Sequence, residues 1–386
     1  MSTDLLYSDI EDSIRDTLHQ LLTAKLDPQS VTAFYDGSTD DSGLWASITK
    51  DLGLGALLIP EEFGGAGATA REAAVVLEEL GRTGAPVPFF TSAVLATTAL
   101  VEAGASELLG ALASGDKTAA LAVPLTSMAG RTALTVSEAD GRLNGTVSSV
   151  ADAGTADVLV VPAASADGTV GLYLVDRSDV SIESVVAFDM SRPLGDVSFS
   201  AASSASILSG VAATNALDKS LRVGAGLLAS EQLGAARWCL ETTLAYVKMR
   251  YQFGRPIGSY QALKHRLADL WLEIGQCHAA ARYAADCLAA DSEDVEVAVS
   301  LAQAYGSDLA VKAAEEAIQM HAGIGMTWEH PAHLYLKRAK ADQLAMGTPE
   351  QHRVRLASLV DLQPAVHSGQ CSSPNSLEVE SGFRLG

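Results

Sequence analysis

Apolar residues recur every three or four positions through most of the N-terminal third of the chain, a spacing that predicts amphipathic helices. The predicted helices cover 4–22, 44–52, 70–82 and 93–112. A proline and three glycines lie within 57–69, so a tight loop is expected there. We therefore predict a helical N-terminal domain over residues 1–118.

The pattern changes near residue 119, where short β-branched runs alternate with Gly, Asp and Ser. Such runs, bounded by turn residues, predict an antiparallel β domain over 119–205. The helical period is clear again from about residue 218.

Helical spacing then persists almost to the C-terminus. The predicted helices cover 218–251, 261–290, 293–321 and 333–346. A helix of about 30 residues is ~45 Å long, and helices of this length suit a four-helix bundle that also forms an oligomer core. We predict this C-terminal bundle over 206–365 and a loose tail over 366–386. The fold class is thus multi-domain α+β, with a helical domain, a β domain and a four-helix bundle in that order.

Composition narrows the choice of partners more than the choice of fold. The 386 residues are 48% apolar and 19% charged, which describes a globular protein rather than a disordered one. Lys and Arg number 26 against 47 Asp and Glu, giving a formal net charge of −21. Such an acidic surface repels nucleic acid and anionic membranes, so we expect neither as a partner. Any anionic ligand must be met by a local cluster of donors.

Cysteine usage and the N-terminus indicate a reducing compartment. No cysteine belongs to a CxxC pair, and the first three lie in apolar helical sequence, which predicts buried thiols. The four cysteines are Cys239, Cys277, Cys287 and Cys371. The polar N-terminus lacks the apolar region of a signal peptide, and no apolar run is long enough to cross a bilayer. We expect a cytoplasmic protein, and no metal site is predicted.

Four segments, in this order, resemble signatures of the acyl-CoA dehydrogenase superfamily. They are PEEFGGAG (60–67), DMSRPLGDVSF (189–199), RYQFGRPIGSYQALKHRLAD (250–269) and QMHAGIGMTWEHP (319–331). The third segment alone is specific, and the resemblance covers about residues 5–360. It implies the fold predicted above, bound FAD, and a homotetramer or dimer in which half of each flavin site comes from another chain.

The resemblance also assigns positions that contact FAD. They are Arg250, Gln252, Phe253, Gln261, Gln319, Gly323 and Thr348. The chemistry fits, because a flavin diphosphate needs fixed cations and N–H donors, and glycine permits close backbone approach. Taken alone, Arg250 would be an ordinary cation at a helix C-terminus, and Gln261 or Gln319 a surface amide. These residues therefore count only through the motif.

The family reaction is α,β-dehydrogenation of an acyl-CoA thioester, as in fatty-acid or steroid β-oxidation. A carboxylate with a raised pKa removes the α proton while the β hydrogen leaves as hydride to flavin N5. Hydrogen bonds to the thioester oxygen, one of them from a backbone N–H, stabilise the developing charge. Electrons then pass to an electron-transfer flavoprotein. The resemblance therefore implies an acyl-CoA substrate and this flavoprotein as a partner.

The usual catalytic glutamate is absent from this sequence. Its position, just before Gly347 and Thr348, is Met346, whose thioether cannot accept a proton. The Met346 backbone N–H could still polarise the thioester. An alternative position for the base in the family is Gly224. Glu231 lies two helical turns further on and is a candidate for a relocated base, or else one half of an ion pair between helices.

The β domain departs from the family pattern as well. PLTSMAGRT (124–132) stands where a Thr-Glu-Pro…Gly-Ser-Asp run is usual, and 145–161 lacks the aromatic residue that often covers the flavin. Ordinary drift, or the loss of this chain's own isoalloxazine pocket, would each explain the changes. The losses resemble heteromeric acyl-CoA dehydrogenases of actinobacterial sterol side-chain breakdown, in which one chain lacks the base and completes its partner's flavin site.

Three hypotheses follow from these observations. The first is an FAD-dependent acyl-CoA dehydrogenase whose base is relocated or supplied by a partner chain. The second is a non-catalytic FAD-binding subunit of a heterotetramer with a homologous chain. The third is a flavin oxidase or monooxygenase on the same fold, which would use oxygen as its electron acceptor.

Overall fold

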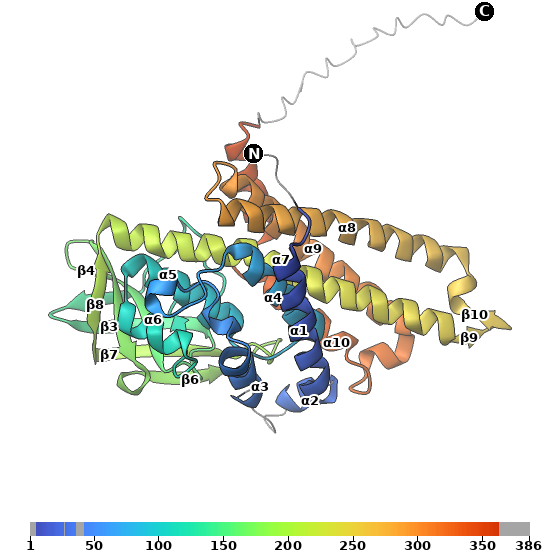
Figure 1. Ribbon diagram of the computed structural model, residues 1–386, viewed down its shortest axis with the longest axis horizontal. Helices are drawn as coiled ribbons and strands as arrows, with labels where there is room; N and C mark the ends of the chain where they lie inside the picture. The colour runs from blue at the N-terminus through green and yellow to red at the C-terminus, as the bar shows by residue number, and fades with distance from the viewer. Residues whose placement is uncertain (1–4, 27, 36–41, 363–386) are drawn as a thin grey trace, which may run out of the picture.

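The computed structural model describes residues 5–26, 28–35 and 42–362 and shows the three parts predicted from the sequence. In Figure 1 helix α4 (Ala70–Thr83) crosses the middle of the long helix α7 (Val211–Met249), and the β-sheet lies at one end of the molecule. The short strands β9 (Tyr251–Gln252) and β10 (Arg255–Pro256) lie at the opposite end (Figure 1).

The N-terminal part consists of short helices. They are α1 (Asp9–Lys25), α2 (Pro28–Tyr35), α3 (Ser42–Ala46), α4 (Ala70–Thr83), α5 (Thr97–Ala103) and α6 (Ser106–Ala113), with π-helical turns at Ser47–Asp51 and Phe89–Ala96. Local signals explain both ends of α4, because Thr69 and Glu72 form a capping box and Gly84 ends the helix at φ +63°. The predicted helix 44–52 is divided between α3 and a π-helical turn. The sequence period does not predict α2, whose eight residues are too few to show one.

The middle part is one eight-stranded sheet. Its strands are β1 (Ala119–Leu121), β2 (Val136–Ala139), β3 (Arg142–Ala151), β4 (Val158–Ser165), β5 (Val170–Asp176), β6 (Ser181–Val185), β7 (Leu194–Ser203) and β8 (Ala205–Ser209). They run in the order β6-β7-β3-β2-β4-β5-β8, and β1 pairs with β4. The antiparallel arrangement predicted from the sequence holds for the other pairings, but β1 and β2 each pair with β4 in parallel. Side-chain alternation is the same in both directions, so the sequence pattern does not reveal this difference.

The C-terminal part is a helical bundle. After α7 it contains α8 (Gln261–Ala289), α9 (Val295–His321), α10 (Ala332–Leu344) and α11 (Pro349–Leu359). Glycines let α4 cross α7 closely: a Cβ at Gly81 would lie 2.0 Å from the Glu231 carbonyl oxygen, and one at Gly234 would lie 1.9 Å from that of Glu78. No side chain fits at either point, so backbones touch there and one apolar core continues from the N-terminal helices into the bundle.

The predicted buried thiols are confirmed for three cysteines. Cys239, Cys277 and Cys287 are free and buried, and burial raises the pKa of the Cys277 thiol to about 12. Cys371 and the predicted tail 366–386 lie outside the described residues. Within the part of the chain that the structure describes, no helix is both long and apolar enough to cross a membrane.

Candidate functional site

A two-residue hairpin loop after α7 displays a phenylalanine. Gln252 of β9 pairs with Arg255 of β10, and Phe253 and Gly254 turn the chain at φ +52° and +77°. Two successive positive φ angles are typical of a type I′ turn, which suits glycine but strains a bulky residue. The Phe253 side chain is nevertheless 90% exposed. A strained and displayed aromatic residue indicates a contact site rather than a purely structural turn.

Polar side chains around this hairpin face outward. Arg250 follows the last residue of α7, and its backbone N–H donates to the Tyr246 carbonyl at 2.9 Å. Its own carbonyl accepts from the N–H of Ile257 at 2.8 Å. The Arg250 side chain is exposed and has no ion-pair partner among the described residues. Gln252 and Gln261, the first residue of α8, are exposed as well.

The second group of predicted contacts lies at the same end of the bundle. Gln319 is exposed in the last turn of α9, and Gly323 follows in the 3₁₀ turn Ala322–Met326. The ring centroids of Tyr246 and His321 lie 4.4 Å apart, which holds the end of α9 against the end of α7. A Cβ at Gly323 would meet no atom within 4 Å, so the backbone there is open to a ligand.

These residues offer what a dinucleotide diphosphate requires. They provide an unpaired guanidinium, exposed amides and an open stretch of backbone, and a displayed aromatic ring lies beside them. Their contact with FAD stays a prediction, and the residues present fit it. We call this group the open half-site: Arg250, Gln252, Phe253, Gln261, Gln319 and Gly323.

The loop between α10 and α11, which carries the usual catalytic position, is packed shut. Met346 is 1% exposed, and its backbone N–H donates to the Leu125 carbonyl at 2.9 Å. Nε2 of His352 lies 3.0 Å from the Met346 carbonyl oxygen. The sequence-based expectation of a free N–H for a thioester therefore does not hold, because the segment before β2 already accepts that hydrogen bond.

Side chains also fill the space beside Met346. The two cavities that border it measure only about 10 Å³ each, whereas small-molecule sites usually measure ~300–1,000 Å³. A Cβ at Gly224, the alternative base position, would lie 2.4 Å from Leu95 Cδ2 and 3.3 Å from Met346 Sδ. The residues present therefore do not fit a flavin ring at this place.

Thr348, which the resemblance assigns to FAD, has a structural role in the same loop. It is the N-cap residue of α11, where its hydroxyl accepts from the Gln351 N–H and its own N–H donates to Gln351 Oε1 at 2.8 Å. Both groups are thus engaged within the chain. We call the packed region the closed half-site: Leu95, Leu125, Met346, Gly347 and Thr348.

Glu231, the candidate for a relocated base, lies in a buried ion cluster. Its side chain is 2% exposed. Arg192 donates to its two carboxylate oxygens at 2.8 and 2.7 Å, and Arg338 donates to one of them. Burial alone would raise the pKa of Glu231, but attraction to both guanidinium groups outweighs burial and lowers it. A general base needs the opposite shift, so the geometry favours the ion-pair alternative.

The ion cluster joins all three parts of the chain. Arg338 of α10 pairs with Asp189 of the β domain at 2.6 Å, and the hydroxyl of Tyr35 in α2 donates to Asp189 at 2.6 Å. Because Asp189 follows β6 and Tyr35 belongs to the N-terminal part, the cluster fixes the β domain and α2 against the bundle.

A third carboxylate, Asp342, completes the cluster. It pairs with Arg192 at 2.6 Å, so three carboxylates face two guanidinium groups. Burial and repulsion from Glu231 raise the pKa of Asp342 to about 7, despite the attraction of the guanidinium groups. We use the name ion cluster for Tyr35, Asp189, Arg192, Glu231, Arg338 and Asp342.

Sequence reasoning singled out only one member of this cluster as chemically important. The available signal was weak: Arg338 and Asp342 are charged positions four residues apart in α10, and such positions usually face solvent. The stretch 189–199 drew attention through the family resemblance alone. In the described ranges, no group of three or more His, Cys, Asp or Glu residues is placed to hold a metal ion.

Comparisons with known proteins agree with this architecture. The N-terminal domain family of acyl-CoA dehydrogenases matches residues 8–115, and their C-terminal domain family matches residues 214–360. Acyl-CoA dehydrogenase IpdE2 of Mycolicibacterium smegmatis is 35% identical over 355 residues, which is 92% of this chain and 99% of that relative.

Solved structures of heteromeric and flavin-bound proteins share the fold. The ChsE4-ChsE5 complex of Mycobacterium tuberculosis is similar at 26% identity and a TM-score of 0.82, covering 94% of this chain and 100% of that one. A variant of the Tcur3481-Tcur3483 steroid ACAD is similar at 28% identity and a TM-score of 0.80, covering 92% and 98%. A glutaryl-CoA dehydrogenase from Mycobacterium smegmatis in complex with FADH2 shares the fold at 22% identity and a TM-score of 0.82, covering 95% and 98%.

Proposed function

Because this chain belongs to the acyl-CoA dehydrogenase family, we propose that it is a non-catalytic subunit of a heteromeric acyl-CoA dehydrogenase. In this role it completes the FAD site of a homologous chain that carries the catalytic carboxylate. The similarity to the ChsE4-ChsE5 complex supports a pairing of two different but related chains.

The contrast between the two half-sites carries this proposal. The hydrogen bond from Met346 to the Leu125 carbonyl closes the place where this chain would hold a flavin ring of its own. The open half-site, in contrast, keeps an unpaired cation and a strained, displayed Phe253. Backbone strain of this kind persists where the exposed residue is used. A chain that keeps only the outward-facing half fits a supporting subunit.

Each residue of the open half-site then has a defined task. Arg250 provides the fixed positive charge for the diphosphate, and Gln252 and Gln319 provide amide donors. Gly323 lets the backbone come close to the ligand, and Phe253 contributes an apolar surface beside it. When bound, FAD supplies the hydride acceptor for α,β-dehydrogenation of an acyl-CoA. The homologous chain provides the ring pocket and the base.

The similarity to a steroid ACAD supports a steroid acyl-CoA as the substrate of the complex, with a fatty acyl-CoA as the alternative. We expect an electron-transfer flavoprotein as the electron acceptor, as the family reaction requires. Neither the acyl-CoA nor the electron-transfer flavoprotein needs to contact the closed half-site of this chain.

Co-expression tests the proposal. The chain is purified alone and together with a homologous acyl-CoA dehydrogenase chain that has glutamate at the position of Met346, and FAD is measured per chain. We expect FAD only in the complex, at about one molecule per two chains. Arg250→Gln should weaken FAD retention by roughly tenfold or more, because a charge-assisted hydrogen bond is worth about 1.5–3 kcal/mol.

The matched control is Lys248→Gln, which removes an exposed cation two residues before Arg250 on the same helix end. This variant should keep the FAD content of the unchanged complex. Stoichiometric FAD in the chain purified alone, with turnover of an acyl-CoA, would show instead a self-sufficient dehydrogenase.

A further inference from the structure

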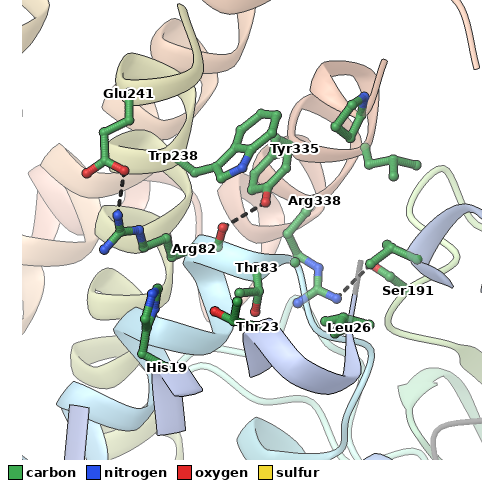
Figure 2. Close-up of a pocket in the computed structure, with 14 residues that line it drawn as sticks. His19, Thr23, Leu26, Arg82, Thr83, Ser191, Trp238, Glu241, Tyr335 and Arg338 are labelled. Carbon is green, nitrogen blue, oxygen red and sulfur yellow. Dashed lines mark hydrogen bonds and ion pairs between the residues drawn. The ribbon is translucent and has the colours of Figure 1, made fainter. Parts of the chain in front are cut away.

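A cavity of about 420 Å³ lies between α1, α4, α7 and α10, apart from both half-sites. Figure 2 shows the residues that line it. Its volume falls within the ~300–1,000 Å³ that is usual for small-molecule sites. None of the described residues of the two half-sites lines it, so the proposed flavin contacts do not account for it.

One wall of the cavity is a fixed pair of aromatic rings. Trp238 of α7 and Tyr335 of α10 are stacked, with ring centroids 3.7 Å apart and planes inclined by 6°. The Tyr335 hydroxyl donates to the Arg82 carbonyl at 2.7 Å, which holds the pair in place. Figure 2 shows this pair on one side of the cavity, and Thr23 of α1 and Leu26, which follows α1, on the other. A flat ring system suits the space between such walls.

The unused polar groups at one end of the cavity are mainly donors. Arg82 donates through Nη2 to Glu241 at 2.6 Å, and its other guanidinium N–H groups have no partner among the described residues. The Trp238 indole N–H, a pure donor, also lacks a partner there, as does the Thr23 hydroxyl. Among the described residues, Glu241 is the only carboxylate that lines the cavity, and Arg82 already neutralises it. Free donors beside an arginine favour a ligand with an anionic group.

The other end of the cavity, at Arg338, is unsuited to the negative charge of a ligand. Arg338 reaches the wall there, but it donates to Asp189, Glu231 and Ser191. Its charge is therefore balanced inside the ion cluster. Apolar residues such as Leu334 also line the cavity. The anionic group of a ligand is consequently placed at Arg82 and its ring between the aromatic pair and α1.

We propose that this cavity binds a flat, ring-containing organic monoanion, such as an aromatic or fused-ring carboxylate. The ring lies against the Trp238–Tyr335 wall, and the carboxylate accepts hydrogen bonds from Arg82 and the Trp238 indole. Glu241 competes with the ligand for Arg82 and sets the affinity. This site does not depend on the proposed role of the chain as a flavin-supporting subunit.

Calorimetric titration with 2-naphthoate tests the site on the full chain. This probe has a flat fused ring and one carboxylate, and it is smaller than the cavity. The neutral alcohol 2-naphthalenemethanol serves as the comparison ligand without the charge. We expect 2-naphthoate to bind at one site per chain and the alcohol to bind more weakly.

Two substitutions at the charged end should act in opposite directions. Arg82→Gln should weaken 2-naphthoate binding by roughly tenfold, as expected for the loss of one charge-assisted hydrogen bond, and change alcohol binding little. Glu241→Gln frees Arg82 and should tighten 2-naphthoate binding several-fold. A purely structural Arg82–Glu241 ion pair would not give this opposite response.

Filling the cavity supplies the second arm of the test. Thr23→Trp and Leu334→Trp approach from opposite walls, and each should abolish binding of both ligands. Thermal unfolding of each variant shows that it is folded, and one folded variant is sufficient. Trp271→Ala removes an exposed aromatic residue on α8 and should leave binding unchanged. Binding that survives a folded filling variant, or that is lost in Trp271→Ala, overturns the proposal, as does an absence of 2-naphthoate binding at millimolar concentration.

Discussion

The open and closed half-sites use their side chains in opposite ways. In the open half-site Phe253 is 90% exposed, and Arg250 extends from a helix end with its guanidinium unpaired in the described part of the chain. In the closed half-site Met346 is 1% exposed, and its N–H is bound to the Leu125 carbonyl. The first surface is exposed and carries a strained backbone at Phe253. The second has become part of the apolar core.

Under the proposed function, this difference means that the two halves of a shared site change independently. In the arrangement that the family resemblance implies, each full flavin site combines a ring pocket from one chain with a diphosphate-binding surface from another. A chain whose ring pocket is filled gains packing, because burying a side chain such as Met346 or Leu95 contributes about 1.5–3 kcal/mol. It can still serve a neighbour through the diphosphate-binding surface, which lies on a different part of the bundle.

The largest expected effect compares arginines from two regions of the bundle. Arg338→Met leaves Glu231 and Asp189 without one of their cation partners inside the core. We expect the free energy of unfolding to fall by about 3–5 kcal/mol, since a buried charge is left uncompensated. Chemical denaturation of the purified chain measures this change.

Arg250→Met is the matched variant in the open half-site. Because Arg250 is exposed and unpaired among the described residues, its loss should change the free energy of unfolding by less than about 0.5 kcal/mol. Equal losses of unfolding free energy in Arg338→Met and Arg250→Met would contradict the view that Arg338 is structural and Arg250 faces a ligand.

A second prediction concerns the residue at the usual catalytic position. Met346→Glu restores the family carboxylate, but the adjoining cavities of about 10 Å³ cannot hold a flavin ring and a substrate. We expect no dehydrogenase activity from the chain alone and a loss of about 2 kcal/mol or more of unfolding free energy, because a carboxylate is buried. The control, Met346→Leu, should cost less than ~1.5 kcal/mol. Turnover by the Met346→Glu chain would show that the closed half-site opens readily.

The ion cluster behind the closed half-site gives a smaller, pH-dependent effect. The pKa of Asp342 is raised to about 7, above its ordinary 3.8, so the folded chain binds this proton more tightly than the unfolded chain. Its contribution to stability is complete at low pH and is lost as the pH rises through 7. Relative to Asp342→Asn, the unchanged chain should lose roughly 1 kcal/mol of unfolding free energy between pH 6 and pH 8.

The difference in unfolding free energy between the unchanged chain and Asp342→Asn isolates the contribution of Asp342, because the two proteins differ only at this position. Denaturant titrations at pH 6, 7 and 8 provide the measurement. A difference that stays constant across this range would mean that Asp342 is ionised throughout, with its charge balanced by Arg192.

Sequence reasoning reached the open half-site through the family resemblance, whose motifs are short and continuous in the chain. The turn at 250–256 contains a glycine, a proline and two aromatic residues within seven positions, and the residues that it places side by side are neighbours in the chain. The helices α7 to α10 were predictable from a period of 3.6 residues that is visible within each one, whereas α11 was not predicted.

The closed half-site and the ion cluster depend on contacts that no local pattern encodes. Met346 and Leu125 are joined by one backbone hydrogen bond although they lie in different domains. The substitution of the catalytic glutamate was visible in the sequence, but the filling of the space around it was not. Likewise, Asp189 and Arg338 look like surface charges until the fold brings them together in the core.

The smallest expected effect tests whether the strain at the hairpin tip serves the ligand. Phe253 adopts φ +52°, a region that asparagine tolerates better than phenylalanine. Phe253→Asn should therefore raise the free energy of unfolding of the isolated chain by about 0.5–1 kcal/mol, since an exposed ring contributes little packing to offset its strain. The same variant should lower the FAD content of the co-expressed complex, because the apolar contact is lost. Gly254→Ala, at φ +77°, is the control: it adds strain without removing the ring, so it should destabilise the chain. If Phe253→Asn raises the free energy of unfolding but lowers FAD retention, the strain is linked to ligand contact. If it lowers both, Phe253 serves the folding of the hairpin itself.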